Sequence, residues 1–305
     1  MGARIMADME SICARLCLLT RAAWKEGLPV PFARTDVNRI IRTGALEGLT
    51  LRRVPGVKEE HYARAEALLS RSCEIAHAVE HCQAQGYHIL LPQDHEWPVN
   101  LRALGARMPQ FLFVRGNRSL LYKRTVAVAG SRMIREKTES IVQSIGKQIA
   151  MQGLTLVCGG ARGVDTAVQK ACLDSGGNLI LVPAYPCSML LRQEYLQHAL
   201  NDGRLLIVCD TWPEEQFSAQ KALVRNHAIY ALGHAAIIAA ARKGTGGTWR
   251  GAMDCLRDGY TPLFAVDEAG TDYEGTRAMI DLGARRLDLL SSLSQQLFQE
   301  GVSKE

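Results

Sequence analysis

Short runs of apolar residues alternate with amphipathic segments between about residue 88 and residue 267. Uninterrupted apolar runs of this length are typical of strands that are buried on both faces of a parallel sheet. The segments between them place apolar residues three and four positions apart, which is the spacing of a helix with one buried face. The pattern predicts strands at QFLFVRG (110–116), RTVAVAG (124–130), LTLVCGG (154–160), LILVPA (179–184), RLLIVCD (204–210), AAIIAAA (235–241) and TPLFAVD (261–267).

Helical spacing separates most of these runs, at residues 137–153, 163–176, 222–233 and 246–259. Strands that alternate with helices indicate a parallel sheet with helices on both of its faces. The predicted fold class is therefore α/β, with a doubly wound, mostly parallel, Rossmann-like sheet.

The first 88 residues have a different pattern, with helical spacing at 9–24, 35–46 and 59–86. We expect a helical domain at 1–88, a Rossmann-like domain at 89–290 and a tail at 291–305. Within the first domain, Pro55 and Gly56 interrupt a segment that resembles a helix-hairpin-helix or SAM-like turn. An ordinary connection between two helices has the same pattern.

Length and composition are those of a globular protein, since 305 residues with 47% hydrophobic composition can form one large domain or two smaller ones. The longest apolar runs, such as AAIIAAA, are too short to cross a membrane, and acids interrupt the N-terminus where a signal peptide needs an apolar core. We expect a cytoplasmic protein with no membrane partner. The nine cysteines form no CxxC pair, so we expect reduced thiols and no metal site.

Positive charge is concentrated in one part of the chain. The net charge is +5, and residues 102–137 contain nine arginines and lysines but a single acid, Glu136. This excess favours a polyanionic partner such as nucleic acid. A solvated face that keeps the protein soluble has the same pattern.

Three predicted strands end in glycine-rich corners, where the chain turns from a strand into a helix. In an open parallel sheet, ligands bind at the carboxyl ends of strands, where helix N-termini direct N–H groups toward anions. Glycines permit sharp turns and close backbone approach, and arginines bind phosphate with two hydrogen bonds. The candidate phosphate-binding residues are Gly130, Ser131 and Arg132 in the first corner, Gly159, Gly160, Arg162, Gly163 and Asp165 in the second, and Lys243, Thr245, Gly246, Gly247 and Thr248 in the third. Each corner alone is also compatible with a tight connection that binds nothing.

A fourth segment, ALVRNHAIYALG, is predicted to contribute to the same edge of the sheet. Arg225 and Asn226 are expected at the start of its helix, where Arg225 contacts phosphate or instead forms a helix-terminal salt bridge. Tyr185 and Trp249 are candidates for stacking on bases, although aromatic residues are more often part of a core. The chain has neither a GxGxxG followed by an acid nor a GxxxxGK[ST], so it lacks the dinucleotide and P-loop fingerprints.

Taken in order, AGSR, GGARGVD, PAYP, RNHAIYALG, GGTWRGA and TRAMIDLGA resemble the motifs of the DprA/Smf family of DNA-processing proteins over about residues 90–290. The resemblance implies a single-stranded DNA-binding protein, usually a homodimer, that protects strands and loads a RecA-type recombinase. We expect no catalytic residue and no cofactor, and no metal because no His, Cys or carboxylate cluster has ligand spacing. The DNA contacts that the resemblance implies are Arg132, Arg162, Arg225 and Asn226.

The chain departs from the family pattern at four positions. Gln169 replaces a histidine, His227 an arginine, Arg277 an asparagine and Ala241 an acid. We also expect no C-terminal winged helix, because few residues follow position 290. A divergent member in phage defence or on a mobile element is therefore one interpretation.

Two other functions are compatible with the same residues. The first is a nucleotide sensor or nucleotide-processing enzyme of the wider SLOG superfamily, whose LOG hydrolases use the acid of PGGxGTxxE. Gly251 occupies that position and Asp254 lies three residues later, so hydrolysis is not expected. The second is a protein–protein adaptor that uses the helical domain. The basic stretch at 102–137 favours DNA, because it extends beyond what one nucleotide needs.

Overall fold

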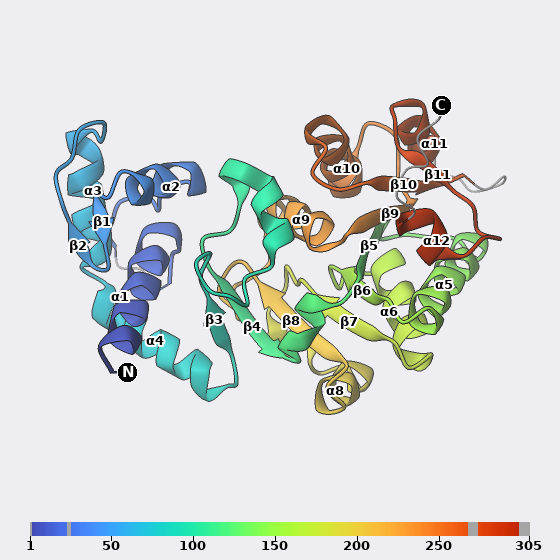
Figure 1. Cartoon of the computed structure of the whole chain (residues 1–305), viewed down its shortest axis with the longest axis horizontal. Coiled ribbons are helices and arrows are strands. Elements are labelled where there is room, and N and C mark those ends of the chain that lie inside the picture. The colour runs from blue at the N-terminus through green and yellow to red at the C-terminus, as the bar shows by residue number, and fades with distance from the viewer. Residues whose placement is uncertain (1, 23–25, 268–273, 299–305) are drawn as a thin grey trace. The chain divides into compact units, whose positions relative to one another are not determined.

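The computed structural model describes residues 2–22, 26–267 and 274–298 (Figure 1). The chain forms two compact units. The smaller unit comprises Met1–Trp97, Gly105–Arg115 and Cys209–Pro213, and the larger unit comprises Pro98–Leu104, Gly116–Val208 and Glu214–Glu305. The domain boundaries at residues 88 and 290 stay predictions.

Four helices make up most of the smaller unit: α1 (Gly2–Leu19), α2 (Arg34–Arg42), α3 (Glu59–Leu69) and α4 (Ser72–Ala84). Helix α1 packs against the other three, and its Leu16 and Leu18 are fully buried. The buried guanidinium of Arg71 donates hydrogen bonds to the carbonyls of Cys17, Thr20, Ala22 and Leu68. It thereby satisfies carbonyl groups at the C-terminal end of α1, which the helix itself cannot pair. Of the helix predicted at 9–24, residues 23–24 lie outside the described residues.

Two short antiparallel strand pairs complete the smaller unit. Strand β1 (Leu46–Glu47) pairs with β2 (Thr50–Leu51), and β3 (His88–Leu90) pairs with β4 (Leu112–Gly116). Because β2 precedes Pro55, the predicted connection between two helices is in fact a connection from a strand to α3. Two 3₁₀ segments lie at Val99–Arg107 and Arg118–Tyr122.

The larger unit is built on seven strands in the order β11-β10-β9-β5-β6-β7-β8, and every neighbouring pair among them is parallel. This confirms the doubly wound, mostly parallel, Rossmann-like class. Each of the seven predicted strand segments overlaps a strand of the structure. The bounds in the larger unit are β5 (Thr125–Gly130), β6 (Thr155–Cys158), β7 (Asn178–Leu181), β8 (Leu205–Cys209), β9 (Ala235–Ala240), β10 (Leu263–Val266) and β11 (Arg285–Leu287).

Helices follow the strands in the larger unit: α5 (Glu136–Met151), α6 (Val164–Asp174), α7 (Cys187–Leu190), α8 (Glu194–Asn201), α9 (Ala219–Leu232), α10 (Gly246–Asp258), α11 (Glu274–Asp281) and α12 (Leu293–Phe298). Helix α12 lies within the predicted tail, whose residues 299–305 are outside the described residues. No helix in the described parts of the chain is long and apolar enough to span a membrane.

The strand order creates a switch point beside β5. From β5 the chain proceeds outward through β6, β7 and β8, and it then returns to place β9 on the other side of β5 (Figure 1). The loops that leave β5 and β9 therefore diverge toward opposite halves of the sheet. In open α/β sheets, a crevice forms at such a point.

Candidate nucleic-acid interface

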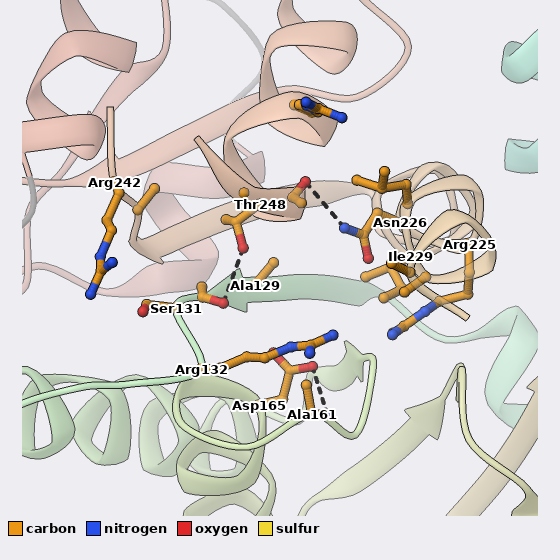
Figure 2. Close-up of a pocket in the computed structure, with 18 of the residues that line it drawn as sticks. Ala129, Ser131, Arg132, Ala161, Asp165, Arg225, Asn226, Ile229, Arg242 and Thr248 are labelled. Carbon is orange, nitrogen blue, oxygen red and sulfur yellow. Dashed lines mark hydrogen bonds between the residues drawn. The ribbon is translucent and has the colours of Figure 1, made fainter. Parts of the chain in front are cut away.

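A pocket of about 600 Å³ opens at the switch point (Figure 2). Its lining comes from the end of β5, the loop and first turn of α6, the helix α9, the end of β9 and the first turns of α10, all within the larger unit. Four separate parts of the sequence, at residues 129–133, 161–165, 217–229 and 241–250, therefore share one site. We call this site the pocket.

The first corner contributes all three of its predicted residues, Gly130, Ser131 and Arg132, to the lining. The Ser131 hydroxyl donates to the Met133 carbonyl at 2.7 Å and accepts from the Met133 N–H at 3.2 Å, so it closes a turn of its own loop. The Ser131 N–H donates to the Ala240 carbonyl at 2.9 Å. These bonds fix the backbone and leave the exposed Arg132 side chain to reach over the pocket.

The second corner acts mainly through Asp165, which lies in the first turn of α6 as predicted. Its carboxylate accepts hydrogen bonds from the N–H groups of Gly159 and Ala161, both at 3.1 Å. These two amides therefore face Asp165 and are not directed at a ligand. Burial raises the pKa of the Asp165 carboxyl, while the charge of Arg225 and the two N–H groups act in the opposite direction.

The other predicted residues of the second corner, Gly159, Gly160, Arg162 and Gly163, do not line the pocket. Arg162 is exposed outside it. A side chain at Gly159 would overlap the guanidinium of Arg225, and one at Gly163, where φ is +75°, would overlap the backbone of Ser131 and Arg132. These two glycines permit close packing of the loops around the pocket.

The third corner contributes Thr245, Gly246, Gly247 and Thr248, whereas Lys243 is exposed and outside the lining. The Thr248 hydroxyl donates to the Gly130 carbonyl at 3.0 Å, which ties the first turn of α10 to the end of β5. The cations that reach the pocket from this side are Arg242 and Arg250, neither of which was predicted.

Helix α9 begins at Ala219, capped by the Ser218 side chain, so the prediction that Arg225 and Asn226 start this helix is wrong. Both residues nevertheless line the pocket from the middle of α9. The Asn226 amide donates to the Gly247 carbonyl at 3.3 Å, and Arg225 is only 4% exposed. This cap was not predicted because the first turn of α9, residues 219–222, contains no large apolar residue.

Positive charge dominates the pocket. Among the described residues that line it, the cations are Arg132, Arg225, Arg242 and Arg250, and the acid is Asp165. Figure 2 shows Arg132 and Arg225 pointing toward one another near Asp165, with Arg242 at the other end of the pocket on the Ser131 side. The first turn of α10 adds backbone N–H groups that its own helix cannot satisfy. The arrangement can bind anionic oxygen atoms at more than one point.

An aromatic stack stands at the rim of the pocket. The rings of Tyr185 and Phe217 are parallel within 12°, with centroids 4.6 Å apart, and the Arg132 guanidinium lies 5.4 Å from the centroid of Phe217. Phe217 lines the pocket and was not predicted, because no motif marks the loop before α9. Trp249, the other aromatic candidate, is half-buried and does not line the pocket.

Comparison with known proteins identifies the family. The model of the family described as DNA recombination-mediator protein A matches residues 88–298. The chain belongs to this family. The resemblance inferred from the ordered motifs is thereby confirmed.

Two relatives of this DprA-family chain have solved structures. The DNA processing protein DprA of Streptococcus pneumoniae is 31% identical over 187 residues, which make up 58% of this chain and 63% of that protein. Its X-ray structure aligns with a TM-score of 0.64 at 21% identity, covering 85% of this chain and 95% of that chain. A structure of the Helicobacter pylori protein, which concerns its single-stranded DNA binding mode, aligns with a TM-score of 0.55 at 22% identity, covering 67% of this chain and 92% of that chain.

Asp254 is the acid three residues after Gly251, which occupies the position of the catalytic acid of the LOG hydrolases. Asp254 does not line the pocket, and its carboxylate contacts His227 at 3.0 Å and Arg257 at 2.8 Å. Within the described residues, no group of three or more His, Cys, Asp or Glu side chains is arranged to hold a metal ion.

Proposed function

We propose that this chain binds single-stranded DNA, with backbone phosphates held in the pocket. The proposal rests on the convergence of four arginines on one pocket, to which β5, α9, β9 and α10 each contribute one. The acid that lines this pocket, Asp165, is buried and accepts hydrogen bonds from backbone N–H groups. Charge-assisted hydrogen bonds from guanidinium groups and from the α10 N-terminus suit phosphodiester oxygens.

Recognition of a strand also needs a contact for its bases, and the stack of Tyr185 and Phe217 supplies one. A nucleobase that displaces the Arg132 guanidinium from the ring of Phe217 can lie against this aromatic rim while Arg132 binds its phosphate in the pocket. Stacking on aromatic rings tolerates every base, because each base has a π face. A duplex conceals those faces, so the arrangement favours single strands.

We infer the cellular role from the resemblance to the DprA family. Such a chain protects single strands and hands them to a RecA-type recombinase during DNA uptake, recombination or phage defence, in the cytoplasm and as a homodimer. It acts by binding and not by catalysis. The position of Asp254, paired with Arg257 outside the pocket, supports the absence of hydrolysis.

A second candidate function is the binding of a free nucleotide. The volume of the pocket, about 600 Å³, lies in the range that accommodates small molecules. A SLOG-type nucleotide sensor would use the same arginines for the phosphates of one nucleotide.

The deciding experiment compares a fluorescent 40-nucleotide single strand, the matching duplex and free nucleotides as competitors by fluorescence anisotropy at two salt concentrations. We expect the single strand to bind more tightly than the duplex, with affinity that falls steeply with salt because bound counterions are released. Duplex preference, or displacement of the strand by micromolar mononucleotide, would contradict DNA binding as the function.

A further inference from the structure

A second hollow of about 730 Å³ lies along α5 and α6, and we call it the groove. Arg132 and Met133 line both the pocket and the groove, so the two hollows adjoin at the loop that follows β5. The walls of the groove include Glu139, Gln143 and Lys147 from α5 and Thr166, Lys170 and Asp174 from α6.

The spacing of these side chains gives the groove a direction. On each helix the three residues are four positions apart, which places them on one face and spreads them over about 12 Å at a rise of 1.5 Å per residue. Helices α5 and α6 both begin at the edge of the sheet where the pocket lies, since each follows a parallel strand, and they pack against one another. Lys170 and Lys147 therefore lie progressively farther from Arg132.

The two lysines carry charges that the protein does not neutralise. Within the described part of the chain, neither Lys147 nor Lys170 forms an ion pair, and both are exposed. The Lys170 ammonium lies 5.6 Å from the centroid of the Tyr195 ring. Other cations of the larger unit, such as Arg257 and Arg277, are paired with aspartates.

The groove differs from the pocket in its charge balance. Arg132, Lys147 and Lys170 face two carboxylates, Glu139 and Asp174, on the same walls. This mixture of charges favours a ligand whose negative charges are spread along the groove over a compact, highly charged anion. An extended chain whose phosphates are spaced apart can reach Arg132, Lys170 and Lys147 in turn along the groove.

We propose that the groove is the path along which the DNA strand leaves the pocket, with Lys170 and then Lys147 each contacting one backbone phosphate. The proposal rests on the proposed function, since the groove is entered past Arg132. It predicts that strands longer than the pocket can hold gain affinity from these two lysines, whereas very short strands do not.

The test compares oligothymidylates of 4 and 12 nucleotides as competitors of a labelled strand, with four variants checked for unchanged melting temperature. The variant K147Q/K170Q alters the groove alone, Arg242→Gln alters the pocket alone, Arg132→Gln alters both, and Lys123→Gln, an exposed lysine outside both linings, is the control.

We expect K147Q/K170Q to bind the 4-mer normally and the 12-mer about 2- to 25-fold more weakly, because each exposed ion pair contributes a factor of about 1.4 to 5. The log–log salt slope for the 12-mer should become shallower by about 1.4, because each of the two phosphates that is no longer neutralised accounts for about 0.7. If K147Q/K170Q binds the 12-mer as wild type does while Arg132→Gln and Arg242→Gln weaken both oligomers, the groove proposal is wrong and pocket binding stands. If none of the four variants changes either affinity, both proposals fail.

Discussion

Replacing Arg132 by glutamine removes a guanidinium that lines the pocket, borders the groove and lies over the ring of Phe217. The side chain is exposed, and Phe217 is its one contact of this kind among the described residues. An exposed cation–π contact contributes about 0.5–1 kcal/mol, so the free energy of unfolding should fall by no more than about 1 kcal/mol.

The expected loss of DNA affinity is larger. A hydrogen bond between a guanidinium and a phosphate contributes about 1.5–3 kcal/mol, which corresponds to a roughly 10- to 150-fold increase in Kd. Because one phosphate contact is removed, the log–log salt slope for single strands should become shallower by about 0.7. Fluorescence anisotropy with a labelled 20-nucleotide strand at several salt concentrations measures both quantities, and urea denaturation measures stability.

Arg162→Gln is the matched control, because Arg162 is also an exposed arginine at a strand end but does not line the pocket. We expect it to weaken binding by no more than about 1 kcal/mol, the range of solvent-exposed ion pairs. Equal effects of the two substitutions would show that the pocket has no special role. A lowered melting temperature for Arg132→Gln with unchanged affinity of the folded protein would refute the reasoning altogether.

Three further predictions concern the same site. Phe217→Leu should weaken single-strand binding by about 1–3 kcal/mol because base stacking is removed. Tyr122→Leu, which replaces a 62% exposed tyrosine outside the pocket, should leave binding unchanged. Fluorescence anisotropy with a labelled single strand measures the Kd of both variants. Gly163→Ala should cost more unfolding free energy than Gly176→Ala, because both have φ near +75° but only at Gly163 does a Cβ meet the backbone; urea denaturation compares them. The free energy of unfolding of Asp165→Asn should rise relative to that of the wild type as pH increases from about 4. Burial raises the pKa of the Asp165 carboxyl, so its ionisation destabilises the folded wild-type protein, whereas asparagine does not ionise. A free energy of unfolding that falls relative to wild type over this pH range would contradict the direction of the pKa shift.

The apolar strands were predictable because their signal is local. A buried parallel strand such as β9 (Ala235–Ala240) is apolar along its whole length, and all of its residues are buried. Strand β11 was missed because Arg285 and Arg286 are exposed there at the edge of the sheet. An edge strand lacks a neighbour on one side, so its composition no longer distinguishes it from a loop.

Part of the candidate site was also predicted, because local sequence patterns mark some of its residues. Gly130, Arg132 and Thr248 follow or begin elements that the sequence marks clearly, and each lines the pocket. Arg162 and Lys243 are as close to a strand end but lie outside the lining, since the direction of a loop side chain depends on the turn that carries it.

The sequence by itself determined the fold class, the family motifs and the edge of the sheet at which a ligand would bind, because periodicity and glycine corners are properties of neighbouring residues. Only the tertiary structure decided which cations share a hollow. Arg225 reaches the pocket from the middle of α9, Arg242 from the end of β9 and Phe217 from a loop without a motif. Their convergence depends on the switch in strand order between β5 and β9, which brings residues more than 80 positions apart into one pocket, and contacts of that range leave no periodic trace in the chain.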